Sequence, residues 1–327
     1  MKLALFGNYG VNNLGDDLIL KGFLNQHPDD EVMVFCGNPD RVHKQFGLEA
    51  HPFFPGGFRS IWKYLISSPY RRLFKRGLRE LKSADRIFVG GGGILVDRHF
   101  KAVFLWWRQL RNISRSGTPF AFVANSFELK HWWSQWLFKT YLKSAEQVTV
   151  RDSASLRLAH SLGAQAKLVE DLAMENVGVK FRMKDPKKTI VLALCKWGLD
   201  KRKMAELRNF VRSRQEEGFE VIGLAFQTEG DDDREVFAEL DTGIPVRSGM
   251  EEVLTELGNC NLIVGMRFHS VLLGLKMQKP VIAIAYQKKV RHLMEDAGKE
   301  MLCLEIQNLN GEKLQSVFEK AVEEGDG

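Results

Sequence analysis

The segment LALFGNYGVNNLGDDLIL, residues 3–20, joins a short apolar run to a glycine-rich turn and then to an amphipathic stretch. A buried strand, a turn and a helix in that order form the repeating unit of a parallel α/β sheet. The same rhythm continues to about residue 170. Its strands have little polar alternation, so both faces of the sheet should be covered. Strands are predicted at Leu3–Phe6, Val32–Phe35, Arg86–Val89, Phe120–Ala124 and Gln147–Val150, and helices at Asp17–Asn25, Val103–Ser114 and Ser153–Leu162.

A second unit of the same kind follows a polar, basic break, ENVGVKFRMKDPKK, at residues 175–188. We therefore predict an N-terminal domain over 1–175, a linker over 176–188 and a C-terminal domain over 189–327. The expected fold is two Rossmann-like α/β domains facing a central cleft, an arrangement of the GT-B type, with ligands at the carboxyl ends of the strands. The second set of strands is predicted at Thr189–Cys195, Glu220–Phe226, Asn261–Val264, Val281–Ala285 and Met301–Leu304. The accompanying helices are predicted at Lys201–Glu217, Asp232–Glu239, Met250–Leu257, Ser270–Met277, Lys288–Asp296 and Glu312–Glu323.

Composition narrows the class of protein. The formal net charge of +6 over 327 residues indicates an anionic partner, whether a phosphorylated substrate, a nucleic acid or an acidic membrane surface. No apolar run is long enough for a signal peptide or a membrane span, so a cytoplasmic location is expected. The alternative is a cytoplasmic protein attached to the inner face of the cell membrane. The four cysteines lie in or beside apolar runs and should be buried free thiols. No metal-ligand spacing occurs, and no metal or cofactor is expected.

The turn GNYGVNNLGDD, residues 7–17, is the first candidate site. Its backbone N–H groups can approach a phosphate or a carboxylate. The glycine spacing is not that of a dinucleotide fingerprint, and the lysine of a phosphate-binding loop is missing. Asp16 and Asp17 stand where an anion would otherwise bind. The alternative interpretation makes Gly15 and Asp16 an ordinary N-cap.

A second glycine cluster, VGGGGILVD at residues 89–97, follows a predicted strand. Four glycines in a row cost conformational entropy, so something is expected to press close to their backbone. A tight turn is the alternative. The cluster makes Gly91, Gly92, Gly93 and Asp97 candidate binding residues.

The motif GMRFHS, residues 265–270, ends one predicted strand and begins a helix. Arg267 offers a planar fork to a carboxylate or phosphate, and His269 suits proton transfer near neutral pH. The alternative for His269 is a helix cap or a satisfied core residue. VRDSAS at residues 150–155 has the same position in the first unit, and Arg151 is expected either to bind ligand or to form an interdomain salt bridge. Lys289, Tyr286 and Asp171 also follow strand ends.

Two stretches mix aromatic and basic residues, at 58–80 and at 130–143. Such a mixture on an amphipathic helix suits an anionic membrane interface, and it also occurs in proteins that bind single-stranded nucleic acid. The third interpretation is a helix that packs on its sheet with extended basic side chains.

Several of these motifs together resemble the polysaccharide pyruvyl transferase family. GNYGVNNLGDD is similar to its N-terminal G-x-x-G-x-x-N-x-G-D-E signature, GGGGILVD to its GGG-x-L-x-D segment and VRDSAS to its VRD-x-x-S block. GMRFHS followed by PVIAIAYQKKV resembles its GMR-x-H and P-x-x-x-x-x-Y-x-x-K blocks. These matches occur in order over residues 7–290. Asp17 stands where the family usually has Glu, Leu172 where proline is common, and ANSFEL at 124–129 where many members have a glycine-rich loop.

The resemblance implies transfer of a pyruvyl group from phosphoenolpyruvate to hydroxyls of a sugar, with a ketal formed and phosphate released. The acceptor is then a sugar of a cell-surface polysaccharide. The Trp- and Arg-rich segment at 58–80 suggests a lipid-linked precursor as acceptor and contact with an anionic membrane, and no nucleic-acid partner is expected. His269 is assigned as the general acid, Arg267 as an anion-binding catalytic residue and Asp16 or Asp97 as the base. The predicted substrate-binding residues are Gly10, Asn13, Gly15, Gly91, Gly92, Gly93, Asp97, Arg151, Asp171 and Lys289.

Two rival functions share these observations. A nucleotide-sugar glycosyltransferase of the GT-B type has the same architecture, but it usually shows a carboxylate for the ribose in its second domain, and the stretch after GMRFHS offers none that is clear. A non-catalytic anion- or saccharide-binding protein is the other rival. It would lose little ligand affinity on removal of His269.

Overall fold

The computed structural model describes residues 1–56, 58–177 and 188–325. The chain divides into two compact units, one of Met1–Val11 with Ile19–Glu175 and the other of Asn12–Leu18 with Asn176–Gly327. The short segment Asn12–Leu18 therefore packs with the second unit although it occurs early in the chain. The predicted linker, 176–188, falls mostly on residues 178–187, which lie outside the described residues.

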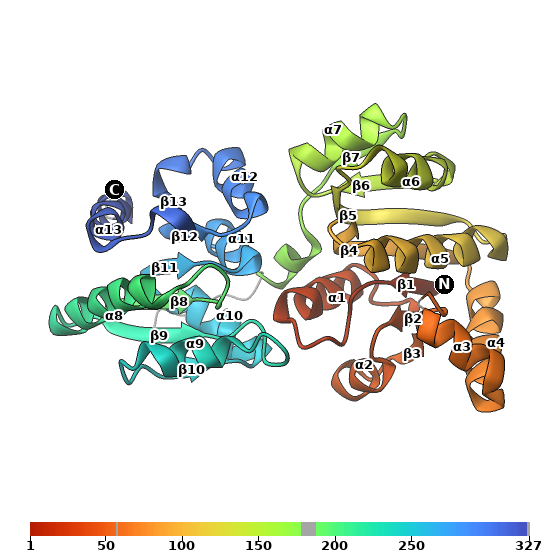
Figure 1. The fold of residues 1–327 in the computed structure, drawn as a ribbon, viewed down its shortest axis with the longest axis horizontal. Coiled ribbons are helices and arrows are strands. Elements are labelled where there is room, and N and C mark those ends of the chain that lie inside the picture. Colours follow the sequence, from red (N-terminus) through yellow and green to blue (C-terminus); the bar gives the residue numbers. More distant parts are fainter. Residues whose placement is uncertain (57, 178–187, 326–327) are drawn as a thin grey trace. The chain divides into compact units, whose positions relative to one another are not determined.

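The first unit is built on a parallel sheet of seven strands in the described residues, in the order β3-β2-β1-β4-β5-β6-β7 (Figure 1). The strands are β1 Lys2–Phe6, β2 Glu31–Cys36, β3 Glu49–Pro52, β4 Arg86–Val96, β5 Phe120–Glu128, β6 Gln147–Val150 and β7 Ala166–Leu168. The helices are α1 Leu14–Gln26, which begins in Asn12–Leu18, and α2 Pro39–Phe46, α3 Phe58–Ile66, α4 Ser68–Ser83, α5 Phe100–Ser116, α6 Trp132–Ser144, α7 Ser153–Ser161 and the 3₁₀ turn η1 Leu172–Asn176.

The second unit repeats the design with six parallel strands in the described residues, in the order β10-β9-β8-β11-β12-β13. The strands are β8 Thr189–Ala193, β9 Glu220–Leu224, β10 Val246–Arg247, β11 Leu262–Gly265, β12 Val281–Ala285 and β13 Cys303–Glu305. The helices are α8 Lys201–Glu216, α9 Asp233–Leu240, α10 Met250–Asn259, α11 Phe268–Lys276, α12 Lys288–Asp296 and α13 Gly311–Gly325, with 3₁₀ turns η2 Glu300–Leu302 and η3 Ile306–Asn308.

Both strand orders confirm the prediction of Rossmann-like α/β folding. Each sheet grows outward from its first strand in one direction and then crosses to that strand's other side, so the order reverses between β1 and β4 and between β8 and β11. In open parallel sheets the crevice at such a reversal, beyond the carboxyl ends of the strands, is where ligands bind. Each unit therefore has one position at which a site is expected.

The strands are buried on both faces, as their unalternating sequences predict. All five residues of β12 and four of the five in β8 are buried. In the first unit the rings of Phe6 and Phe35 stack with centroids 4.4 Å apart, and Phe54 packs beside them. Full burial of side chains of this size stabilises a fold by about 1.5–3 kcal/mol each.

Several boundaries differ from the sequence-based prediction. Strands β4 and β5 continue to Val96 and Glu128, seven and four residues beyond their predicted ends, because the two strands keep pairing across the glycine cluster. Helix α1 begins at Leu14 rather than Asp17. The strand predicted at Met301–Leu304 is wrong in its first half, where η2 precedes β13.

The cysteines match the prediction of free thiols. Cys36, Cys195 and Cys260 are buried and Cys303 is half-buried, and none forms a disulfide. Burial raises the pKa of the Cys36 and Cys260 thiols to about 12, so they stay protonated at neutral pH. Among the described helices, none combines the length and the apolar composition that crossing a bilayer requires.

Candidate active site

Arg267 and His269 lie at the strand-order reversal of the second sheet. Strand β11 ends at Gly265, Arg267 is the N-cap of α11, and His269 is in the first turn of that helix. A helix N-terminus carries a partial positive charge, which the guanidinium of Arg267 reinforces. The position therefore favours an anion, as the sequence predicts.

Asp233, the first residue of α9, holds Arg267 in place. The Nε of Arg267 donates to Oδ2 of Asp233 at 3.0 Å, and its Nη2 donates to Oδ1. Asp233 is 1% exposed, and its Oδ2 also accepts from the backbone N–H groups of Phe226 and Gln227, each at 3.0 Å. Burial alone would lower the pKa of Arg267, but the carboxylate of Asp233 outweighs it and raises the pKa. Arg267 is therefore a fixed, permanent cation.

The fork of Arg267 is only partly used by Asp233. A guanidinium carries five N–H donors, and the pair with Asp233 engages one on Nε and one on Nη2. Its side chain keeps 14% of its surface exposed. The carboxylate therefore orients the guanidinium, and Nη1 takes no part in these two hydrogen bonds.

Segment Asn12–Leu18 packs against this same edge of the second unit. Asn13 forms an antiparallel bridge with Gln227, and the N–H of Leu14 donates to the carbonyl of Phe226 at 2.7 Å. The N–H of Thr228 donates to the carbonyl of Asn12 at 3.3 Å. Residues Asn13 and Leu14 of the glycine-rich turn are thus hydrogen-bonded to the segment of Phe226 and Gln227, whose N–H groups bind Asp233.

Gly15 lies directly against the imidazole of His269. A Cβ atom built on Gly15 would stand 1.9 Å from Nδ1 of His269, which no real pair of atoms tolerates. The backbone of Gly15 is helical, so its missing side chain, rather than an unusual φ, is what the position requires. The structure thus brings together Gly15 and His269, two predicted site residues 254 positions apart in the printed sequence.

Four further side chains line this edge. The Nζ of Lys289 lies 5.5 Å from the ring centroid of Phe268, whose ring meets that of His269 edge-on at 5.3 Å. Tyr286 follows β12 and interacts with the thiol of Cys195, which follows β8; burial raises the pKa of both groups. Both are neutral at physiological pH, so the charge here comes from the basic residues and Asp233.

The reversal point of the first sheet is filled by the chain itself. Tyr9 is fully buried, and its hydroxyl donates to the carbonyl of Gly90 at 2.5 Å. A Cβ on Gly7 would lie 2.3 Å from the Tyr9 ring, and one on Gly91 would lie 2.0 Å from Ile19. These glycines therefore admit Tyr9 and Ile19, and the atoms that press on Gly91 belong to the protein.

The other predicted glycines differ in their surroundings. Gly10 has φ +77°, and a Cβ there would lie 2.6 Å from the carbonyl oxygen of Asn38. Gly92 is buried with φ 94°. Gly93 is exposed, with Val96 as the nearest neighbour of a built Cβ, at 3.8 Å. Gly93 is thus the residue of the cluster that the structure leaves accessible.

Arg151 and Asp171 form a buried ion pair within the first unit, with side chains 3% and 2% exposed. The Nε of Arg151 also donates to Oγ of Ser126 at 2.8 Å. Asp152 is the N-cap of α7, as the sequence suggests. Asp171, the ion-pair partner of Arg151, thus lies in the same unit as Arg151.

Asp97 fastens the loop before α6. Its Oδ2 accepts from the N–H groups of Lys130 and His131 and from the hydroxyl of Ser134, at 2.7, 2.8 and 2.7 Å. Burial raises the pKa of this carboxyl, but the three donors outweigh burial and lower it. Asp97 therefore stabilises the start of α6. The other candidate base, Asp16, is half-buried in the first turn of α1, next to Gly15.

We expect Asp97→Ala to lower the free energy of unfolding by about 3 kcal/mol at pH 7, because three hydrogen bonds to a buried carboxylate are lost. The folded-state pKa is lowered, so this contribution is complete above the unfolded pKa and disappears as pH falls through the folded pKa. Urea denaturation of both proteins across acidic pH checks it. Asp29→Ala, at an exposed position, is the control; equal losses for both variants would contradict the assignment.

Sequence reasoning missed Asp233. The run GDDDREV, residues 230–236, looks like a helix cap, and Asp232 does accept from the N–H of Arg234 at 2.9 Å. The next carboxylate instead points inward to Arg267. The available signal was a second aspartate directly after the cap, at the start of the helix that follows a buried strand.

Comparison with solved structures defines the class of fold. A UDP-N-acetylglucosamine 2-epimerase of Listeria monocytogenes, described as putative, matches with TM-score 0.64 and 11% identity over 100% of this chain and 88% of its own. The enzyme of that name from Neisseria meningitidis, bound to UDP-GlcNAc, matches with TM-score 0.61 and 12% identity, covering 100% and 93%. Anabaena HepE in complex with UDP-glucose matches with TM-score 0.55 and 12% identity, covering 99% and 98%. The fold is thus of the GT-B type.

The family follows from the sequence itself. A family model described as polysaccharide pyruvyl transferase matches residues 13–288, most of the chain. The chain belongs to the polysaccharide pyruvyl transferase family. The resemblance of the ordered motifs is thereby confirmed.

Proposed function

We propose that this protein transfers a pyruvyl group from phosphoenolpyruvate to hydroxyls of a sugar in a cell-surface polysaccharide or its lipid-linked precursor. A pyruvate ketal forms and phosphate is released. Family membership supports a transferase. The observation that carries the choice of donor is the placement of a fixed Arg267 beside His269 at the reversal point of the second sheet.

Donor binding needs positive charge, because phosphoenolpyruvate carries both a carboxylate and a phosphate. Arg267, oriented by Asp233, offers its remaining N–H groups to one of these anions. The N-terminus of α11 and the exposed Lys289 supply positive charge for the other. Arg151, the third basic residue of the motifs, pairs with Asp171 in the first unit.

The chemistry begins with a proton. His269 in its protonated form donates to the methylene carbon of phosphoenolpyruvate, which becomes a methyl group and leaves an oxocarbenium-like centre. A sugar hydroxyl attacks this centre and loses its proton to a base. A second hydroxyl then displaces phosphate as its proton passes to the departing phosphate, so the products are one ketal and one inorganic phosphate.

Asp16 is our candidate for the base. It follows Gly15, which contacts His269, and it is half-buried in the first turn of α1. Asp97 is the weaker alternative, since its Oδ2 already serves three donors. We assign Gly93, the accessible glycine of the cluster, to binding of the acceptor.

The test is acceptor-dependent release of phosphate from phosphoenolpyruvate, measured with a panel of free and lipid-linked saccharides. A parallel arm replaces phosphoenolpyruvate with UDP-sugars, which are bound in two of the similar solved structures. We expect phosphate release in the first arm and no UDP release in the second. UDP release that depends on an acceptor, with phosphoenolpyruvate untouched, would overturn the proposal in favour of a glycosyltransferase.

A further inference from the structure

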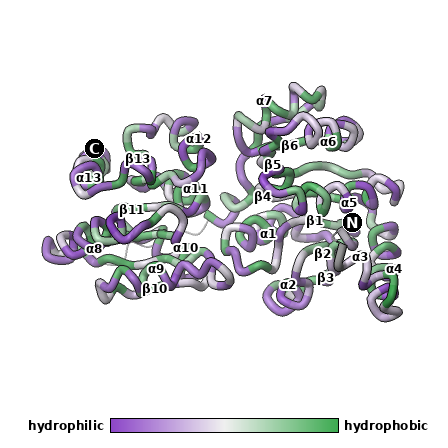
Figure 2. The backbone as a smooth tube through the Cα atoms, in the orientation of Figure 1, coloured by the Kyte–Doolittle hydropathy of each residue, from purple (hydrophilic) through white to green (hydrophobic). Residues whose placement is uncertain are grey.

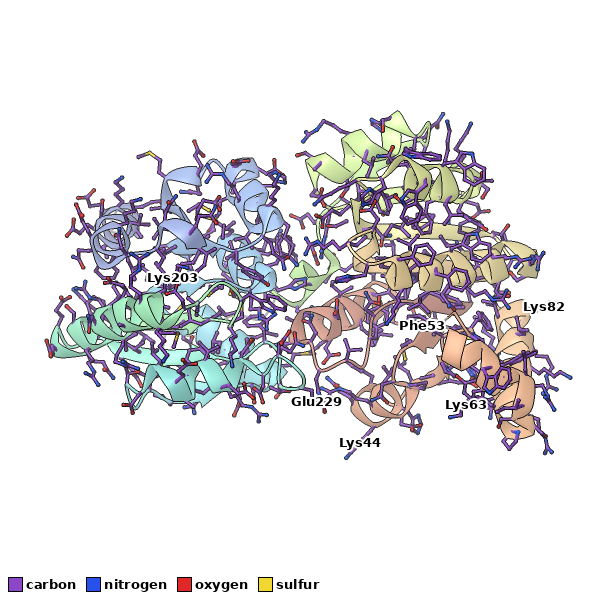
Figure 3. All side chains as sticks on the ribbon, in the orientation of Figure 1. Lys44, Phe53, Lys63, Lys82, Lys203 and Glu229 are labelled. Atoms are coloured by element: carbon purple, nitrogen blue, oxygen red, sulfur yellow. The ribbon has the colours of Figure 1, made fainter. Side chains whose placement is uncertain are left out.

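The hairpin of α3 and α4, residues 58–83, concentrates the charge of the protein. Its 26 residues contain eight Lys and Arg but one acidic residue, Glu80, whereas the whole chain has a formal net charge of +6. The rest of the chain is therefore slightly acidic. Figure 3 marks Lys63 on α3 and Lys82 at the end of α4, and Figure 2 shows hydrophilic and hydrophobic residues interleaved along α4.

The same hairpin exposes large apolar side chains. Trp62, Leu65 and Ile66 of α3 are 58%, 59% and 65% exposed, and Leu73 of α4 is 42% exposed. Single exposed apolar residues are normal on protein surfaces, but four on one short hairpin form a group that needs a partner.

These side chains are not needed to attach the hairpin to its own unit. A different face of α4 does that, with Phe74, Gly77 and Leu81 buried. The Phe74 ring packs edge-on against Tyr70 at 4.6 Å and against Tyr64 at 6.1 Å, which joins α4 to α3. The Nζ of Lys63 lies 5.0 Å from the Tyr70 ring centroid. The hairpin is therefore a folded platform whose outer apolar residues remain exposed.

We propose that the α3–α4 hairpin docks on an anionic membrane surface. Trp62, Leu65 and Ile66 enter the boundary between headgroups and acyl chains, while Arg72, Lys75 and Arg79, all exposed on α4, meet anionic headgroups. Leu and Ile have no ring on which a nucleobase stacks, so this set of side chains fits lipid better than single-stranded nucleic acid. The inference goes beyond the proposed function and does not depend on the donor.

The experiment is sedimentation of the full chain with vesicles of phosphatidylcholine, with and without phosphatidylglycerol. We expect binding only to vesicles that contain phosphatidylglycerol, weakened by added salt. R72Q/K75Q/R79Q should bind about 100-fold more weakly, because each cation near an anionic surface contributes about fivefold. The control K201Q/K313Q/K320Q removes three exposed cations from the second unit and should bind like wild type. Equal weakening in both triple variants would overturn the proposal.

The apolar part is tested separately with W62S/L65S/I66S, for which we expect a loss of about tenfold or more. The control is W132S/W136S, which removes two aromatic residues that are 78% and 73% exposed on α6. Loss in the α6 variant alone would overturn the assignment to the hairpin. Docking on lipid would be overturned if wild type failed to bind vesicles that contain phosphatidylglycerol. It would also be overturned if wild type bound a single-stranded oligonucleotide more tightly than these vesicles and R72Q/K75Q/R79Q abolished that binding. Because no turnover is measured, these outcomes are independent of the proposed reaction.

Discussion

His269→Ala is expected to lower the turnover number by about 10³-fold, because loss of a general acid typically costs 10²- to 10⁴-fold. The KM for phosphoenolpyruvate should change little, since Arg267 and Lys289 remain. His269→Gln, which keeps polarity but cannot deliver a proton near neutral pH, should behave like the alanine variant. Initial rates of phosphate release, with circular dichroism to check folding, provide the measurement. Turnover within threefold of wild type in either variant would remove His269 from the mechanism.

The contact between Gly15 and His269 allows a sharper test. In wild type, Gly15→Ala forces the imidazole aside, because the new Cβ would stand 1.9 Å from Nδ1. A displacement of this size at a reacting group costs about 10²-fold in turnover. In the His269→Ala background the obstacle is gone, so the same substitution should cost nothing further.

Gly37→Ala is the matched control, because its Cβ would meet Val11 at 3.6 Å, an ordinary contact. It should leave turnover unchanged in both backgrounds. Equal losses from Gly15→Ala with and without the imidazole would show that Gly15 acts on something other than His269.

Asp233→Ala is expected to lower the free energy of unfolding by about 3–5 kcal/mol, because it leaves the buried cation of Arg267 unpaired. Two backbone donors, at Phe226 and Gln227, also lose their acceptor. Where the variant still folds, the KM for phosphoenolpyruvate should rise more than turnover falls, since a loose guanidinium binds the donor poorly. Urea denaturation and steady-state kinetics measure the two effects.

The double variant D233N/R267M separates structure from binding. Asparagine still accepts from the backbone N–H groups, and methionine removes the unpaired charge, so most of the stability should return. Binding of phosphoenolpyruvate should not return. Recovery of both stability and donor affinity would mean that Arg267 only holds the fold.

The sequence was sufficient to predict those site residues whose positions follow from local structure. Arg267 caps a helix that follows a buried strand, and His269 lies in the first turn of that helix. Their place at the carboxyl edge of the sheet therefore depends on six neighbouring residues, 265–270. The strand-helix rhythm predicted both sheets for the same reason. Local pattern and global fold agree along most of this chain.

The glycine clusters show where a sequence stops being informative. Four glycines at 90–93 correctly indicated a close approach, but the pattern does not name the approaching atoms. These are the Ile19 side chain at Gly91 and the Val123 carbonyl at Gly90. The strand β4 also continues through the cluster, although glycine has low strand propensity, because β5 pairs with it throughout. Tertiary pairing overrides propensity here.

Buried charge pairs were equally hidden. Asp233 and Arg267 are 34 residues apart, and Arg151 and Asp171 are 20 apart. Each arginine alone looks like a ligand-binding group at a strand end. How accessible each arginine is to a ligand depends on a partner that only the folded chain brings close. The side chain of Arg267 is 14% exposed, whereas that of Arg151 is 3% exposed.

The most direct test follows the carbon skeleton of the donor. Phosphoenolpyruvate labelled with ¹³C at its enol carbon is incubated with the enzyme and an acceptor saccharide that supports phosphate release. We predict a labelled ketal carbon in the saccharide, bonded to a methyl group that gains one deuterium in D₂O, with one phosphate released per ketal. Label recovered only as free pyruvate, or a saccharide extended by a sugar from a nucleotide donor and carrying no label, would contradict the account.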